Sequence, residues 1–291
     1  MYFQVGRKGF EPSNPAMSRH FDSNFWKSYD KYLRNNLSPK TAKDRILYGR
    51  KYHGILITED AKELLTLKTE KRVHVMKSLA SMSKYMGCYH RWKGIREKYQ
   101  LKWSNIDGFS SFNNVFDSRR NLTSMITWLK NACSKLTEDY SNVLVYCTLT
   151  GLRPNEACDS IKLIHNDFDN YINHQTFILE HFRYPDIFIR RTKKAYMSVL
   201  TKGILEYGKN SGTYDYDTMK RIIRKNNLHM NMSYCRKIFA TFLRTSMIES
   251  ETIDLLQGRV PRSMFARHYF RPDINNERIR VVLNSLMKKI T

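Results

Sequence analysis

Residues 255–270, which read LLQGRVPRSMFARHYF, are the stretch around which the chain is organised. The stretch is basic and aromatic, and it contains an arginine, Arg259, and a tyrosine, Tyr269. Two more arginines stand in short motifs upstream, Arg153 in TGLRPNEA and Arg236 in RKIFAT. Guanidinium groups can grip the oxygens of a phosphodiester, and a tyrosine hydroxyl can attack its phosphorus. The set therefore predicts phosphoryl-transfer chemistry in the C-terminal part of the chain.

Net charge is the strongest signal in the composition. Lys and Arg number 50 against 27 Asp and Glu, which leaves a formal net charge of +23. Such an excess repels itself in a compact protein and indicates a polyanionic partner. A basic membrane-surface protein is the alternative, but no amphipathic Lys/Arg helix dominates the sequence. Nucleic acid is therefore the expected partner, bound with a steep dependence on salt.

Length and residue content indicate a folded protein that works inside the cell. The 291 residues suffice for two domains, and a hydrophobic content of 41% is typical of a globular chain. No run of about 18 uncharged apolar residues is present, so we expect no membrane span. The N-terminus lacks the apolar core of a signal peptide, which favours a cytoplasmic, nucleoid-associated location.

The cysteines are scattered and form no CxxC pair, so a structural zinc site is not expected and buried thiols are. The cysteines are Cys88, Cys133, Cys147, Cys158 and Cys235. We expect neither a metal nor a cofactor.

Composition and periodicity divide the chain into four segments. Residues 1–17 contain glycine and proline with little periodicity, which predicts a flexible tail. Apolar residues at three- and four-residue steps predict a helical, basic domain over residues 18–104. A small, polar stretch predicts a linker at 105–114, and residues 115–291 form the second domain. The expected fold is mainly α, with a small β-sheet or hairpin in the second domain (α+β).

Helical periodicity starts at residue 21. Ser38 is a candidate helix cap, and Pro39 falls in the first turn of the helix that follows. The further helices are expected at 59–65, 71–86, 89–99, 117–134, 137–149, 216–225, 234–247, 251–256 and 275–289. Strand-like composition at 177–179, 187–189 and 195–200 surrounds the run RRTKK, residues 190–194. This pattern predicts a hairpin with a basic tip.

These motifs, in this order, resemble those of the tyrosine recombinases (phage-type integrases), and most closely those of integrases from archaeal viruses and plasmids. TGLRPNE is similar to the family's first arginine box and RKIFAT to its second, which implies that Arg153 and Arg236 clamp the scissile phosphate. Gly258-Arg259 stands where most members have Gly-His, and archaeal members are similar in having arginine. Tyr269 then falls at the position of the family's nucleophile.

The resemblance implies metal-independent chemistry. The tyrosine attacks phosphorus, forms a 3′-phosphotyrosine and expels a 5′ sugar oxygen, while the arginines stabilise the charge that accumulates. The basic tip resembles the family's lysine-bearing hairpin. Lys193 is therefore the candidate that protonates the leaving oxygen, and Lys194 remains an alternative.

One position departs from the family's pattern. The second box usually begins with His or Lys three residues before the arginine, and here that position is Ser233. Serine can hydrogen-bond a phosphate oxygen, but it carries no charge and is not an acid at about pH 7. His229 and Lys237 lie nearby, though neither fits the spacing.

The resemblance implies a site-specific recombinase that integrates or excises a mobile element at double-stranded attachment sites. It also implies a two-domain C-shaped clamp, with residues 18–104 as a core-binding (SAM-like) domain. The protein would be a homotetramer on DNA and a monomer or weak oligomer when free. Two alternatives remain open: a type IB topoisomerase-like enzyme without a partner strand, and a catalytically inactive, recombinase-derived DNA-binding protein.

Three further features extend this interpretation. Basic residues along one predicted helix suit phosphate contacts: Lys40, Lys43, Arg45, Arg50 and Lys51. The segment from about residue 275 either docks on a neighbouring protomer, as in family members, or packs on its own domain. Residues 9–12, Gly-Phe-Glu-Pro, can be encoded by GGG-TTC-GAA-CCC, which matches the T-arm of a tRNA gene. Some archaeal integrases carry their attachment site in their own gene in this way, so a tRNA gene is a candidate target.

Overall fold

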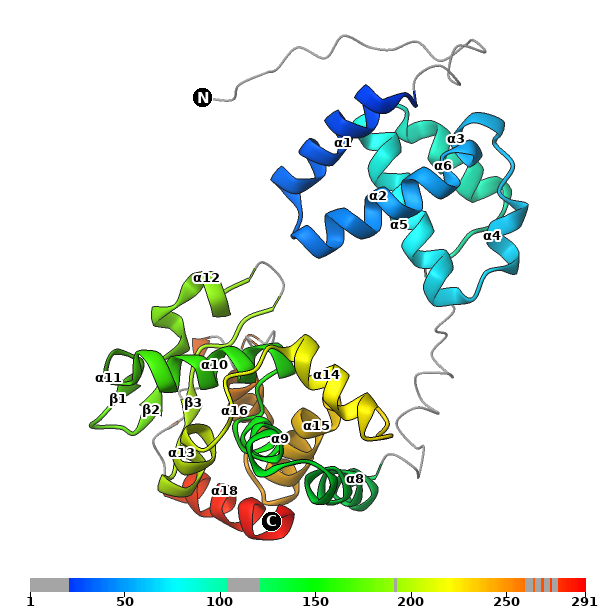
Figure 1. Cartoon of the computed structure of the whole chain (residues 1–291). Coiled ribbons are helices and arrows are strands. Elements are labelled where there is room, and N and C mark those ends of the chain that lie inside the picture. The colour runs from blue at the N-terminus through cyan, green and yellow to red at the C-terminus, as the bar shows by residue number, and fades with distance from the viewer. Residues whose placement is uncertain are drawn as a thin grey trace, which may run out of the picture. The chain divides into compact units, whose positions relative to one another are not determined.

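The computed structural model describes residues 21–103, 121–190, 193–259, 264, 268–269, 273 and 277–291. The chain divides into two compact units, Met1–Val115 and Phe116–Thr291, each of which is considered by itself (Figure 1). The expected tail (1–17) and linker (105–114) lie outside the described residues, as do residues 9–12.

The described part of the N-terminal unit is a bundle of helices (Figure 1). The helices are α1 (Ser23–Asn36), α2 (Pro39–Tyr52), α3 (Gly54–Thr58), α4 (Lys62–Thr66), α5 (Thr69–Tyr85) and α6 (Tyr89–Lys98). Helix α2 packs along α5 and against α1, and Trp92 and Tyr29 are among the largest fully buried side chains. As predicted, α2 begins at Pro39, with Ser38 in the cap position.

The helix expected at 59–65 is present but begins later, at Lys62, because the backbone breaks at residues 59–61. Glu59 adopts a left-handed conformation, with φ of 58°, and ends α3. The Asp60 carboxylate then accepts a hydrogen bond from the Lys62 backbone N–H at 3.0 Å, so α4 begins as a new helix. Side-chain bonds of this kind compete with continuation of a helix.

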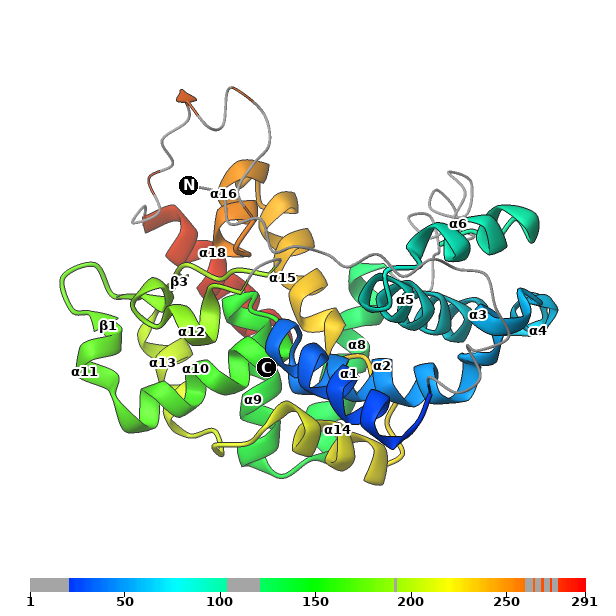
Figure 2. The same cartoon turned by 90° about the horizontal axis from the view of Figure 1, so that it is seen from above.

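The C-terminal unit is built around one buried helix, α9 (Glu138–Thr150), in which residues 142–150 are all buried. Figures 1 and 2 show α9 between α13 on one side and α8 on the other, and α10, α15 and α18 also pack on it. The other helices are α8 (Leu122–Lys135), α10 (Pro154–Asn166), α11 (Phe168–Tyr171), η3 (His181–Arg183), α12 (Pro185–Phe188), α13 (Lys202–Lys209), α14 (Tyr216–Lys225), α15 (Ser233–Thr245), α16 (Ser250–Leu256) and α18 (Glu277–Ile290).

A small antiparallel sheet completes this unit, which confirms the predicted mainly α fold with a little β-structure. Its strands, in the order β1-β2-β3, are β1 (Ile172–Asn173), β2 (Ile178–Leu179) and β3 (Ser198–Val199). The strand expected at 187–189 is wrong, because Pro185 starts the short helix α12. Among the described residues here, Ile189 pairs in an isolated bridge with Lys194, and residues 189, 190, 193 and 194 are called the basic hairpin below. Neither β1 nor α13 was expected.

A chain of buried polar groups ties the sheet to the helices. The Ser160 hydroxyl lies 2.7 Å from the Tyr146 hydroxyl and accepts from Tyr171 at 2.8 Å. The Tyr171 hydroxyl also meets Nδ1 of His181 at 2.5 Å, and Nε2 of His181 lies 2.8 Å from the Ser198 hydroxyl. Burial lowers the pKa of His181 from 6.5 to about 3, so this ring is neutral at physiological pH.

The C-terminal helix α18 packs on its own unit, where it contacts α8, α9 and α15. Its inner face consists of Ile279, Val282, Leu283, Leu286 and Ile290, all buried. Of the two readings of this segment, the structure shows packing on its own domain. Cys133 is partly buried and the other four cysteines are buried, all as free thiols. None of the described helices combines the length and apolar character needed to cross a membrane.

Candidate active site

The first arginine motif forms a tight turn between two helices. Gly151 ends α9 with φ of 65°, and a Cβ atom there would come within 2.5 Å of the Phe239 ring. Leu152 is buried, and Pro154 occupies the first turn of α10. Arg153 is therefore the N-cap residue of α10, with its side chain at the surface of the turn and 22% exposed.

Glu156 anchors this arginine from one turn further along α10. Its carboxylate is 1% exposed and accepts hydrogen bonds from the Arg153 backbone N–H at 3.0 Å and from Nη1 at 2.9 Å. The same Nη1 atom donates to the carbonyl oxygen of Lys194 at 3.0 Å. Within the described part of the chain, Nε and Nη2 of Arg153 make no hydrogen bond, which leaves a donor edge for an anion.

Arg236 joins the two other motif turns. It lies in the first turn of α15, where Nη1 donates to the Gly151 carbonyl at 2.9 Å and Nη2 donates to the Gln257 carbonyl. The Gln257 amide returns a bond to the Arg236 carbonyl at 2.9 Å. Burial, together with the positive charges of Arg153 and Arg259, lowers the pKa of Arg236 to about 10. The bonds from Arg236 to the turns that carry Arg153 and Arg259 bring the three motif arginines together, and they are called the arginine cluster below.

Gly258 brings the third motif against the basic hairpin. Its φ is 68°, and a Cβ atom there would lie 1.7 Å from the carbonyl oxygen of Lys194. Arg259 follows, with its backbone N–H bonded to the Asp254 carbonyl at 2.7 Å and Nη1 paired with the Asp254 carboxylate at 3.1 Å. Its side chain is 57% exposed, so it can reach a bound partner.

The basic hairpin contacts the arginine cluster through the Lys194 carbonyl, which accepts a hydrogen bond from Arg153. The Arg190 backbone N–H donates to the Lys193 carbonyl at 3.0 Å, and Nη2 of Arg190 pairs with the Glu156 carboxylate at 2.7 Å. Lys193 is exposed and Lys194 is partly buried. The backbone of Lys194 therefore contacts the arginine cluster, and Lys193 is the residue next to it in the chain.

This arrangement agrees with the comparison of the sequence with known families. Residues 125–277, more than half of the chain, match the family described as archaeal phage integrase. The chain belongs to the archaeal phage integrase family. A search of curated proteins finds no match. Membership confirms the resemblance to phage-type integrases, and it makes the protein a site-specific integrase with DNA as its partner.

In the integrase, Tyr269 is exposed, and the described residues show no contact between its side chain and the arginine cluster. Its side chain is 75% exposed, and its ring neighbours that of His268, with centroids 6.5 Å apart. Among the described residues, it makes no hydrogen bond to Arg153, Arg236 or Arg259. Most of the residues around Tyr269 lie outside the described part of the chain.

Ser233, the departure from the family pattern, is the exposed first residue of α15, one turn before Arg236. His229 is exposed in the preceding segment, where its carbonyl accepts from the Trp128 indole at 3.1 Å. The Lys237 ammonium lies over the Tyr234 ring at 5.6 Å. Neither side chain is shown at the arginine cluster of the integrase.

Sequence reasoning missed two residues of this site, Glu156 and Arg190. Glu156 had a usable signal, because an acid three residues after a helix N-cap is the spacing of a capping box. Arg190 had none, since it is one of four basic residues in the run RRTKK. Only the path of the chain shows that its guanidinium reaches α10.

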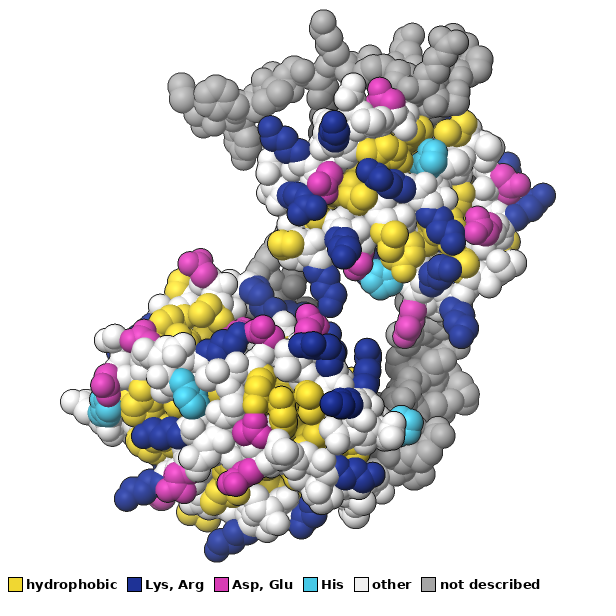
Figure 3. All heavy atoms as spheres, in the orientation of Figure 1, with side chains coloured by type: hydrophobic (Ala, Val, Ile, Leu, Met, Phe, Trp, Pro, Cys, Tyr) yellow, Lys and Arg dark blue, Asp and Glu magenta, His cyan; other side chains and the backbone are white. Residues whose placement is uncertain are grey.

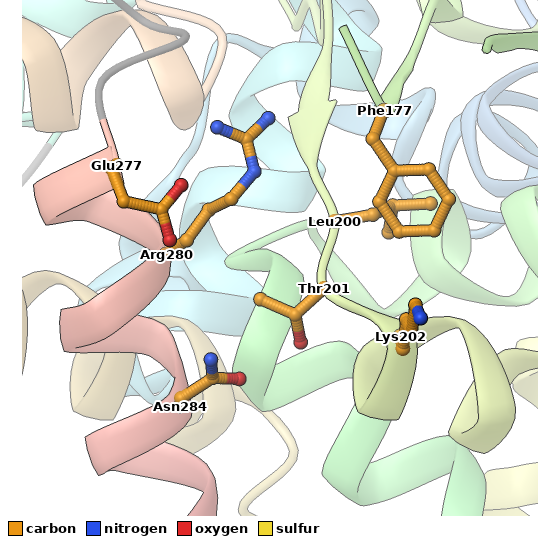
Figure 4. A pocket seen from close by; sticks show the side chains of 7 residues that line it. All are labelled: Phe177, Leu200, Thr201, Lys202, Glu277, Arg280 and Asn284. Atoms are coloured by element: carbon orange, nitrogen blue, oxygen red, sulfur yellow. The ribbon is translucent and has the colours of Figure 1, made fainter. Parts of the chain in front are cut away.

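A separate cavity of about 280 Å³ lies where α18 meets the sheet (Figure 4). Glu277, Arg280 and Asn284 line it from α18, and Phe177, Leu200, Thr201 and Lys202 line it from the segments beside β2 and β3. Nη2 of Arg280 donates to the Thr176 carbonyl at 2.6 Å, which ties α18 to the sheet. The residues that line this cavity include no member of the arginine cluster, so the two are separate features of this unit.

Figure 3 shows Lys and Arg side chains scattered over the visible surface of each unit. In α2, Lys40, Lys43, Arg50 and Lys51 are exposed, as a phosphate-binding face requires. Arg45 is different, because Nη1 points to the His74 carbonyl at 3.3 Å and burial lowers its pKa. The predicted basic face therefore has four members instead of five.

Proposed function

We propose that this integrase cuts and rejoins DNA as a tyrosine recombinase, through a 3′-phosphotyrosine intermediate. The observation that carries the proposal is that Arg236 donates to the Gly151 and Gln257 carbonyls, which ties it to the turns that carry Arg153 and Arg259. Three guanidinium groups close together repel one another, and a dianionic or more highly charged species that binds between them relieves this repulsion. The pentacoordinate phosphorus of a phosphodiester displacement is such a species.

In the proposed mechanism, the Tyr269 oxygen forms a bond to the scissile phosphorus as the phenol loses its proton. The bond from phosphorus to the 5′ oxygen breaks, and Lys193 supplies the proton that this oxygen takes up. Lys194 is the alternative donor. Religation to a partner strand reverses these steps, with the 5′ hydroxyl as the nucleophile.

Approach of Tyr269 to the cluster is part of the proposal. Its high exposure supports this, because a ring that is not packed into a core loses little when it moves to a bound phosphate. We further propose that the N-terminal unit is the core-binding domain, that strand exchange uses a homotetramer on two sites, and that the target is a tRNA gene. Codons other than GGG-TTC-GAA-CCC at residues 9–12 would argue against that target.

The test is a covalent-trapping assay with nicked suicide duplexes that carry the candidate attachment site, without metal, beside Tyr269→Phe. A protein-sized band that retains DNA on a denaturing gel and is lost in Y269F would support the mechanism. A site that is bound without forming the band would favour the inactive DNA-binding alternative. Ser233 is the feature that supports this alternative, because it replaces the His or Lys that usually stands at this position. Relaxation of supercoiled DNA by a monomer without site preference would favour the topoisomerase-like alternative.

A further inference from the structure

We infer that Arg190 is a positioning residue: its ion pair with Glu156 holds the basic hairpin, and with it Lys193, at the arginine cluster. The inference rests on the proposed tyrosine mechanism and deepens it, because it assigns a task to a residue that the mechanism does not use.

The first observation is a shared carboxylate. Oε1 of Glu156 accepts from Nη1 of Arg153 at 2.9 Å and from Nη2 of Arg190 at 2.7 Å. The carboxylate is 1% exposed, so its charge is held away from water and is compensated mainly by these two cations. One buried anion therefore fixes a phosphate-binding arginine and the base of the hairpin at once.

The second observation is the way in which Arg190 reaches Lys193. The Arg190 backbone N–H donates to the Lys193 carbonyl at 3.0 Å, next to the bridge between Ile189 and Lys194. A displacement of Arg190 therefore moves Lys193 directly. Lys194 is held separately, by the bond from Arg153 to its carbonyl and by the close approach of Gly258.

The third observation is that the ion pair determines where the Arg190 side chain lies. Its Nε atom is buried and has no hydrogen-bond partner among the described residues. A buried donor without a partner is unfavourable, and this conformation of Arg190 leaves one such N–H unbonded. The short contact with Glu156 offsets that loss, as expected of a residue that serves as a tether.

The role can be tested by changing the leaving group. In a duplex with sulfur in place of the bridging 5′ oxygen, the expelled thiolate is a much weaker base than an alkoxide, so it can leave without a proton donor. Loss of a positioned general acid should therefore slow cleavage of the oxygen substrate and leave the sulfur substrate nearly unaffected. Loss of a phosphate-binding arginine should slow both.

We expect Arg190→Ala to slow adduct formation on the oxygen substrate by roughly 10²-fold, the lower range for general acid catalysis. On the sulfur substrate its rate should return to within a few-fold of the wild type, as for Lys193→Ala. The matched control is Arg183→Ala, which removes another Arg–Glu pair, with Glu180, away from the cluster. It should change neither rate.

The possible results distinguish the positioning role of Arg190 from a direct phosphate contact and from failure of the proposed function. A defect of R190A on both substrates would overturn the positioning role and indicate a direct phosphate contact, and an unchanged rate on both would overturn it as well. No adduct from the wild type on either substrate would reject the proposed function and the inference together. If circular dichroism shows R190A to be unfolded, Arg190→Lys replaces it, with a smaller oxygen-specific defect expected because the forked pairing with Glu156 is lost.

Discussion

The carbonyl oxygen of Lys194 occupies the space into which a Cβ atom on Gly258 would project, 1.7 Å away. The third arginine motif and the basic hairpin therefore touch through their backbones, where only glycine fits. The contact matters for the site, because Arg153 donates to the same Lys194 oxygen. Two motifs and the hairpin meet at one atom.

Gly258→Ala should therefore impair both stability and adduct formation. The left-handed backbone, with φ of 68°, costs a non-glycine residue about 1–2 kcal/mol, and the clash also forces the hairpin away from the cluster. The midpoint of thermal unfolding should fall, and trapping should drop with it. Gly94→Ala is the control, because nothing lies within 4 Å of a Cβ at that helical position, and it should leave both unchanged or slightly raise stability. Normal trapping by G258A would contradict this account.

Arg236→Lys should lower the rate of adduct formation by roughly 10²–10³-fold, as for loss of one preorganised donor to a transition state. Lysine keeps the charge but cannot bond the Gly151 and Gln257 carbonyls while also facing the phosphate. Single-turnover trapping rates at saturating DNA would measure the effect. Equal rates for the variant and the wild type would show that Arg236 is structural alone.

Stability should fall in mild acid because of His181. The folded-state pKa of about 3 lies below the ordinary 6.5, so the unfolded chain binds more protons between these values and unfolding becomes easier as pH falls. The loss at pH 5 is about 2 kcal/mol. Denaturant midpoints measured from pH 7 to 5 would show the slope, which His181→Gln should reduce. His174→Ala, at an exposed site, should retain it.

Salt titration can distinguish the exposed basic residues of α2 from Arg45, which is partly buried. Lys43→Ala should reduce the slope of log affinity against log salt by about one, because one phosphate contact is lost. Arg45→Ala should lower stability, because Arg45 packs toward the His74 carbonyl, and should leave the slope unchanged. A changed slope for R45A, or an unchanged one for K43A, would contradict the assignment of the face.

Much of the fold could be predicted from local patterns. The helix at 216–225 was predicted to the residue, because apolar positions at helical spacing alternate there with basic ones. The Ser38-Pro39 start of α2 was also confirmed, since cap chemistry involves neighbouring residues only. Prediction failed at 187–189, where apolar content resembled a strand but Pro185 and the short chain path produced a helical turn.

The sequence by itself determined the three arginine motifs and the glycine turns that present them, because each depends on a few consecutive residues. Only the tertiary structure decided that Glu156 is shared by Arg153 and Arg190, and that Arg236 bonds both the Gly151 and Gln257 carbonyls. These contacts join segments that are brought together by packing on α9 and by the small sheet. Local residue patterns carry no information on which buried charge will meet which cation.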